Sequence, residues 1–139
     1  MKALSTIIII TLFSFKSHAS CPEIEKPALE FINGYISKPL QTDEYQWLSD
    51  SKLVTKDFIY SYKNMREQGF ERDPELGLGY NPIVIAQDTP DRYQTKLCSA
   101  IESSVTVSGV GMPHFETVIF LKKLNGTWLV NGAGHVNVK

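Results

Sequence analysis

The dipeptide Asn125-Gly126 constrains this chain more than any other feature, because it joins two runs of apolar, β-branched and aromatic residues. Asn-Gly accepts positive φ at both centres of a type I′ turn, so we expect a tight β-hairpin here. An isolated hairpin is marginal in water, so the rest of the chain must bring further strands and a helix. The turn sets the register, in which the facing pairs are Leu124–Thr127, Lys123–Trp128, Lys122–Leu129, Leu121–Val130 and Phe120–Asn131.

The spacing of apolar residues predicts helices in the first half of the chain and strands in the second. Helical spacing predicts one helix from Pro27 to Pro39, a short one after Thr42, and a third that Ser49-Asp50-Ser51 caps and Gly69 ends. Alternation of period two predicts strands at 92–100 and 103–110 before the hairpin. This order predicts an α+β fold, with N-terminal helices packed on a curved four-stranded antiparallel meander sheet.

Residues 69–91 follow neither period and are rich in glycine and proline. A connection this long inside a small domain is usually functional, partly structured or mobile. We expect Ile83 to Ala86 to form an apolar plug on the core, with Asx turns at both ends. The tip Glu71-Arg72-Asp73-Pro74-Glu75 is polar, stiffened by proline and not needed by the core, so it is the expected contact for a partner.

The first 19 residues have the basic, apolar and small-residue zones of a secretory signal peptide, with cleavage expected after Ala19. The apolar run is too short to span a bilayer, and no other run approaches the length required. Removing Lys2 and Lys16 leaves 12 Lys and Arg against 15 Asp and Glu. We therefore expect a periplasmic or secreted, mildly acidic chain with one α+β domain at residues 20–139.

Two cysteines, Cys21 and Cys98, are expected to pair in an oxidising compartment. Closing so long a loop restricts the unfolded chain by about 4 to 5 kcal/mol on the entropic model. Lipidation of Cys21 is the competing interpretation, because small residues precede it, although His18 stands where such sites carry an aliphatic residue. Two free thiols are the third possibility.

No motif for catalysis, metal binding or a cofactor stands out. His114 and His135 lack a second ligand at metal spacing and are expected to be solvated loop residues. The chain has no Ser-His-Asp order, no phosphate-binding glycine loop and no basic stripe that would bind nucleic acid. We read Gly132-Ala133-Gly134 as a flexible or bulged strand end.

The segment from Asn81 to Asp88, followed by strands that end in Asn125-Gly126-Thr127-Trp128, resembles a family of small exported bacterial proteins of unknown function. Members of that family are similar to the nuclear-transport-factor-like, or cystatin-like, α+β fold. The resemblance covers about residues 27 to 135. This chain has Asn81 where an acidic residue is expected before the proline.

A non-enzymatic binding protein of the periplasm, of the inhibitor or immunity type and directed at a cell-envelope protein, agrees best with these features. Its expected contacts are Glu71, Arg72, Asp73, Glu75 and Asp88. The alternative is a small-ligand carrier or an enzyme that uses the cone-shaped pocket of the fold, with Asp88 as its buried carboxylate. A structural component of the envelope is the third class.

The intact mass of the mature protein tests the cysteine pairing. We expect a mass two hydrogens below that of the reduced chain, with no alkylation unless a reductant is added. A diacylglycerol adduct on Cys21, or two thiols that alkylate without reductant, would contradict the pairing.

Overall fold

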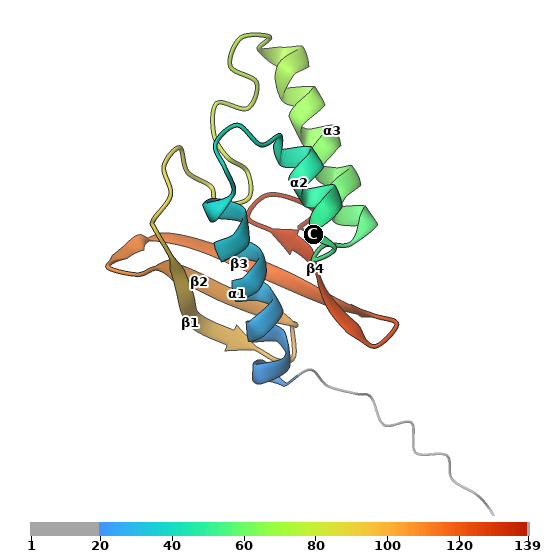
Figure 1. The fold of residues 1–139 in the computed structure, drawn as a ribbon, viewed down its shortest axis with the longest axis vertical. Helices are drawn as coiled ribbons and strands as arrows, with labels where there is room; N and C mark the ends of the chain where they lie inside the picture. The colour runs from blue at the N-terminus through green and yellow to red at the C-terminus, as the bar shows by residue number, and fades with distance from the viewer. Residues whose placement is uncertain (1–19, 139) are drawn as a thin grey trace, which may run out of the picture.

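The fold is known from a computed structural model, which describes residues 20–138. Its elements are α1 (Cys21–Ser37), α2 (Glu44–Ser51), α3 (Lys56–Arg72), β1 (Tyr93–Ser99), β2 (Ser104–Gly109), β3 (Met112–Leu124) and β4 (Thr127–Ala133). The strands form one antiparallel sheet in the order β1-β2-β3-β4. The predicted α+β layout of helices on a four-stranded meander is confirmed, and Figure 1 shows α1 lying across one face of the sheet. The predicted signal peptide lies outside the described residues.

The hairpin at Asn125-Gly126 has the predicted register over its first four pairs, from Leu124–Thr127 to Leu121–Val130. The fifth prediction is wrong, because Phe120 pairs with Gly132 and leaves Asn131 as an extra residue in β4. A β-bulge of this kind bends its strand. Asn131 is held there from both sides, since its side chain accepts a hydrogen bond from the Thr55 hydroxyl and its carbonyl accepts one from Asn137.

The core lies between α1 and the sheet. The α1 side chains on this face have no solvent exposure, and neither do the sheet side chains that form one cluster with them. Burial of this apolar surface is the main term that stabilises such a domain. The buried residues of the two layers include Ile24, Ala28, Phe31 and Ile32 from α1, and Val105, Val107, Ile119 and Val130 from the sheet.

Helix α1 begins at Cys21, six residues before the predicted start at Pro27. Proline inside a helix removes one backbone hydrogen bond, which is why the sequence pattern placed the boundary there. The extra turns are stabilised by burial of Ile24 and by the carboxylate of Glu23, which accepts a hydrogen bond from the Ser20 backbone N–H at 3.3 Å.

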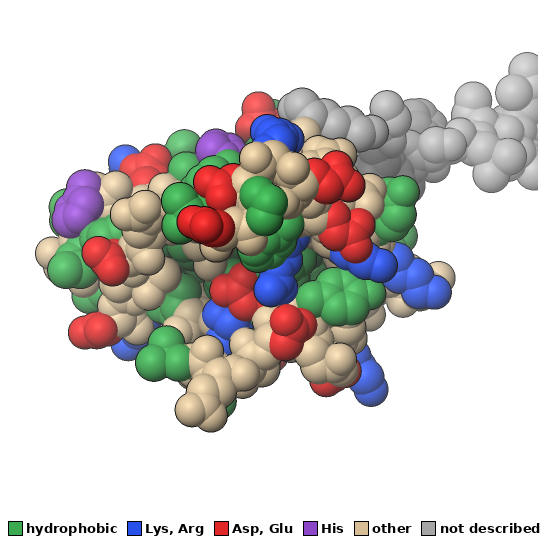
Figure 2. Space-filling view, turned by 90° about the horizontal axis from the view of Figure 1, so that it is seen from above, with side chains coloured by type: hydrophobic (Ala, Val, Ile, Leu, Met, Phe, Trp, Pro, Cys, Tyr) green, Lys and Arg blue, Asp and Glu red, His purple; other side chains and the backbone are tan. Residues whose placement is uncertain are grey.

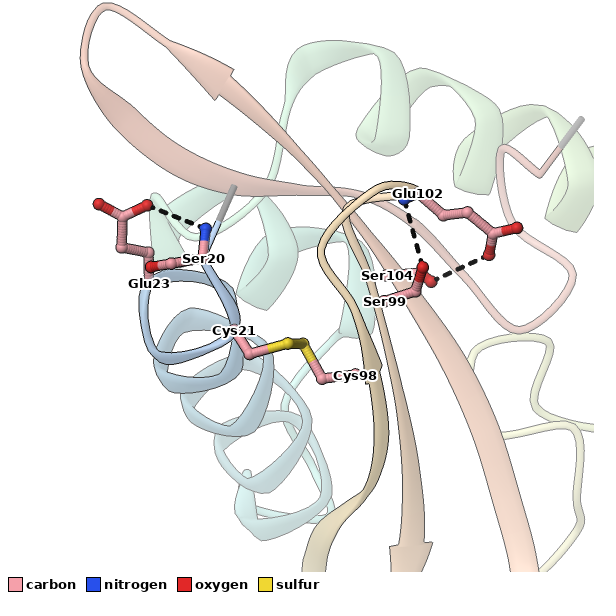
Figure 3. Close-up of a disulfide and its surroundings, with 7 residues drawn as sticks. All are labelled: Ser20, Cys21, Glu23, Cys98, Ser99, Glu102 and Ser104. Atoms are coloured by element: carbon pink, nitrogen blue, oxygen red, sulfur yellow. Dashed lines mark hydrogen bonds between the residues drawn. A yellow bond between two sulfur atoms is a disulfide. The ribbon is translucent and has the colours of Figure 1, made fainter. Parts of the chain in front are cut away.

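The disulfide between Cys21 and Cys98 is present, as predicted, and joins the first turn of α1 to β1. The two Cα atoms are 5.9 Å apart, within the usual range for a disulfide. Figure 3 shows the bridge passing from the end of the helix to the strand beside it. It therefore holds the N-terminal end of α1 against the edge of the sheet.

The third helix starts later than predicted. Lys52 adopts the left-handed conformation and ends α2, and Leu53 and Val54 then run alongside β4 rather than forming helix. Val130 accepts a hydrogen bond from Thr55 N and donates one to Leu53 O, each at 2.9 Å. The cap of α3 is Thr55, whose hydroxyl accepts from the Phe58 N–H, so the predicted cap at residues 49–51 is wrong. This pairing covers part of the edge of β4.

Asn33 of α1 and Lys38, the C-cap residue of this helix, both face the protein. The Asn33 amide donates to Tyr93 O at 3.1 Å and accepts from Tyr93 N at 2.8 Å, and so occupies both backbone groups of the first residue in β1. Asn33 thus replaces a missing neighbouring strand at that point. Lys38 lies over the Tyr35 ring, with its Nζ 4.0 Å from the ring centroid.

Candidate functional site

Residues 73–92 connect α3 to β1 and are here called the α3–β1 segment. The C-terminal end of α3 and the first part of this segment project beyond the sheet (Figure 1). The prediction that Gly69 ends the third helix is wrong, because α3 continues to Arg72. Gly69 is instead buried under Leu78, whose Cγ would lie 2.8 Å from a Cβ at this position. The segment therefore folds back onto the last turns of α3 and packs there.

The charged tip predicted from the sequence is divided between these two elements. Glu71 and Arg72 lie exposed in the last turn of α3, and Glu75 lies exposed in the turn that follows. Asp73 has a structural role, since its carboxylate accepts hydrogen bonds from the backbone N–H groups of Glu75 and Leu76, each at 3.0 Å. Asp73 therefore shapes the tip, and substituting it would alter the backbone there.

The prediction that Ile83 to Ala86 form a buried plug is confirmed for the first two residues and wrong for Ile85. Ile83 and Val84 are buried, and the Asn81 side chain accepts hydrogen bonds from the backbone N–H groups of both, which forms the expected Asx turn at the first end. Ile85 is not part of the plug. It adopts a left-handed conformation and its side chain is 43% exposed, because the tight turn between Asn81 and Ala86 points it outward.

The C-terminal residues hold the plug in place. His135 N donates to Pro82 O at 2.8 Å, and the Thr117 hydroxyl donates to Ile83 O at 2.9 Å. A Cβ at Gly134 would collide with the carbonyl oxygens of Pro82 and Ile83, and its φ of +58° also favours glycine. The glycines expected at a bulged strand end thus allow a close backbone approach.

The two histidines have different partners in the described part of the chain. His135 is exposed, with its Nδ1 2.9 Å from the hydroxyl of Tyr80. His114 lies on β3 beside the ring of Phe115. Both are exposed, as predicted, but only His135 lies in a turn, because His114 is a residue of the strand.

A cleft of about 350 Å³ opens between α2, α3 and the α3–β1 segment. A second hollow of about 240 Å³ lies on the other side of Glu44, which lines both. Large apolar side chains with much of their surface exposed line the cleft, and Figure 2 looks onto this end and shows hydrophobic side chains beside acidic ones. The exposed fractions are 44% for Phe70, 71% for Leu76 and 37% for Tyr80.

The cleft is lined by two charged residues, Glu44 and Arg66, and each has a partner of opposite charge. The Tyr62 hydroxyl donates to the Glu44 carboxylate, and Lys38 Nζ lies 3.5 Å from the same carboxylate. The Arg66 guanidinium lies 3.4 Å from a carboxylate oxygen of Asp43. A backbone hydrogen bond from Gln46 and the charge of Arg66 lower the pKa of Asp43. The interior of the cleft therefore carries little net charge.

Two tyrosines beneath the cleft stay protonated. Burial, the nearby Tyr62 and the charge of Glu44 raise the pKa of Tyr35, whose hydroxyl accepts a hydrogen bond from the Asn81 amide at 2.7 Å. Burial and the hydrogen bond to Glu44 raise the pKa of Tyr62. Both are neutral polar groups that position their neighbours, and neither is poised to exchange a proton near neutral pH.

Asp88 lies on the surface between Gln87, which lines the cleft, and Thr89, which lines the second hollow. It is an exposed carboxylate, next in the chain to a residue of the cleft. The space between α1 and the sheet, where the cone pocket was expected, is filled by Phe31, Tyr35 and other buried side chains.

A single cluster of potential metal ligands occurs among residues 20–138, and it consists of Cys21, Glu25 and Cys98. The disulfide uses both sulfur atoms, so the thiolates that would bind a metal are not available. In the same range, no helix is long and apolar enough to cross a membrane.

Sequence reasoning missed the cleft itself. Its floor brings together Glu44 and Tyr62, which are 18 residues apart, and its walls come from α3 and the α3–β1 segment. The available signal was the presence of Phe70, Leu76 and Tyr80 in a polar, glycine-rich stretch that lacks helical or strand periodicity.

No family model and no curated protein matches the chain. Among solved structures, the chain is similar to a chain in the crystal structure of the type VI native effector-immunity complex Tae3-Tai3 from Ralstonia pickettii. The two share 18% sequence identity with a TM-score of 0.53, over 80% of this chain and 93% of the other. At this identity the likeness concerns the fold alone, an α+β fold with three helices and a four-stranded antiparallel sheet.

Alkaline unfolding tests the burial of Tyr62. Its pKa is raised in the folded protein, so above about pH 10 it ionises in the unfolded chain first, and stability falls as pH rises. Each such tyrosine contributes a loss of about 1.4 kcal/mol per pH unit. Urea unfolding between pH 8 and pH 11 should therefore show a shallower loss in Tyr62→Phe than in the wild type.

Tyr60→Phe is the matched control, because the Tyr60 side chain is on the same helix and is 69% exposed. It should leave the pH dependence of unfolding unchanged. An equal slope in the wild type and in Tyr62→Phe would show that the Tyr62 phenol is solvated.

Proposed function

We propose that this chain is an exported, non-enzymatic immunity-type protein, which binds an effector protein and blocks it. The neighbour in the type VI effector-immunity complex supports this class through its fold. Because one fold serves many functions, the proposal depends on the site at the end of α3.

The observation that carries the proposal is the exposure of Phe70, Leu76 and Tyr80 around one cleft. An apolar cluster bordered by polar groups is typical of a protein-binding surface, where a few large side chains contribute most of the affinity. Phe70 is fixed by α3, and the α3–β1 segment that carries Leu76 and Tyr80 is held by hydrogen bonds of Asn81, Thr117 and His135. Little conformational freedom is therefore lost on binding.

Export to the periplasm is part of the proposal. A disulfide persists in an oxidising compartment, and Cys21–Cys98 joins the two ends of a long stretch of chain. The signal peptide predicted at residues 1–19 would direct the chain there. An effector delivered by a neighbouring cell would meet it in that compartment.

The filled core favours binding over catalysis or ligand transport. A carrier or enzyme using the cone pocket needs space between α1 and the sheet, and Phe31, Tyr35 and Phe58 occupy that space with almost no exposure. Asp88, the carboxylate predicted for such a pocket, lies on the surface. Partner contacts proposed at this end are Glu71, Arg72, Glu75 and Asp88, in addition to the apolar cluster.

Competition between sister cells tests the proposal. In the bacterium that encodes this chain, a strain lacking the gene should lose viability when it is grown in contact with its parent. The wild-type gene should restore survival. A gene carrying Leu76→Ser should give at least about tenfold fewer survivors, because loss of a central apolar contact weakens binding by that factor or more.

Leu97→Ser is the matched control, because Leu97 is 65% exposed but lies on β1, away from the cleft. It should protect as well as the wild type does. Equal survival of the deletion strain and its parent would contradict an immunity function, and full protection by Leu76→Ser would show that the partner binds elsewhere.

A further inference from the structure

The charged groups at the end of α3 are arranged in two zones. Of the residues that line the cleft, Glu44 is paired with Lys38 and Arg66 is paired with Asp43. Around the rim, four carboxylates and one basic group take part in no ion pair among the described residues. These are Glu71, Asp73, Glu75, Asp88 and Arg72, which together give the rim a net charge of −3.

Three rim carboxylates are exposed and belong to residues that are next in the chain to residues lining the cleft. Glu71 follows Phe70, Glu75 precedes Leu76, and Asp88 follows Gln87, and each of these three neighbours lines the cleft. Exposed carboxylates therefore lie close to the apolar surface, and Figure 2 shows acidic side chains beside hydrophobic ones at this end. The pattern differs from an isolated acidic cluster, because the charges border a concave apolar site with exposed walls.

We infer that the cleft receives an apolar side chain at the tip of a protruding loop of the partner, with Lys or Arg residues beside that tip facing Glu71, Glu75 and Asp88. This inference rests on the proposed function and adds the chemistry of the partner's contact.

The size and polarity of the cleft support this occupant. Its volume of about 350 Å³ is near the lower end of the range for binding pockets, which suits the tip of a loop better than a large ligand. A charged tip would meet carboxylates and bases that already neutralise each other, so it would lose hydration without gaining a partner. An apolar tip loses no hydrogen bonds and covers Phe70, Leu76 and Tyr80.

The rim then contributes selectivity and association rate. Like charges facing each other across an interface are unfavourable, so a partner with acidic residues beside its tip is excluded. Opposite charges speed the encounter and are screened by salt.

Selection from a library of short, disulfide-closed random loops displayed on phage tests this inference without knowledge of the effector. The intact protein is the target, at low and at physiological ionic strength. Enriched loops should carry an aromatic or aliphatic residue beside Lys or Arg. Enrichment of acidic or uncharged loops, or no enrichment above an unrelated protein, would overturn the inference.

Two pairs of variants locate the bound loops. Glu71→Gln with Glu75→Gln should weaken their binding about three- to tenfold at low ionic strength, and less at physiological ionic strength. Leu76→Ser should weaken it about tenfold or more at both. The control for the rim pair is the double variant Glu30→Gln with Glu102→Gln, and the control for Leu76→Ser is Leu97→Ser. These residues are exposed and lie on other parts of the chain, so both controls should leave binding unchanged. Equal loss in the rim pair and its control would overturn the assignment to the rim.

The loop selection and the competition assay test different claims, so either claim can be rejected without the other. Protection by the wild-type chain together with acidic selected loops would reject the partner chemistry and keep the immunity function. In the opposite case, the selected loops are basic and apolar and need Leu76 for binding, but the protein gives no protection. That result would support the contact chemistry and reject the immunity function.

Discussion

The packing of α1 against the sheet is the interaction on which the rest of the structure depends. Its buried side chains fill the space that a ligand would otherwise occupy, and the disulfide holds its N-terminal turn on β1. At its other end, Asn33 pairs with the backbone of Tyr93, and Tyr35 accepts a hydrogen bond from Asn81. The same helix thus stabilises the core, closes one end of the sheet edge and supports the segment that carries the candidate site.

A long connection becomes a rigid surface here through a small number of specific contacts. Leu78 packs on Gly69, Asp73 closes the turn at the tip, and the plug around Ile83 accepts hydrogen bonds from Thr117 and His135. These contacts leave Phe70, Leu76 and Tyr80 exposed although they are large and apolar. Their exposure is not required by the fold, which is the physical reason for assigning them to a partner.

The sequence predicted those parts of the fold that local chemistry decides. Asn125-Gly126 set four pairs of the hairpin, Asp43 began α2 by accepting from Gln46, and Asn81 formed its Asx turn. Predictions failed where distant contacts decide the outcome. Pro27 lies inside α1 because Ile24 and the disulfide stabilise the preceding turns, and Asn131 forms a bulge because Thr55 and Asn137 bind it.

The candidate site was predicted only in part for the same reason. Glu71, Arg72 and Glu75 were proposed from their polarity and are exposed, but the structural role of Asp73 depends on a turn that sequence patterns do not specify. The cleft beside them depends on the contact of Glu44 with Tyr62, across two helices. Periodicity within one element carries no information about such a contact.

The central claim is that the end of α3 binds a protein, and site-specific photocrosslinking in living cells tests it most directly. A photoreactive amino acid at position 76 should crosslink to a second protein when the cells are in contact with effector-producing neighbours, whereas the same amino acid at position 97 should not. Crosslinks from position 97 alone would contradict the claim and place the partner on the sheet.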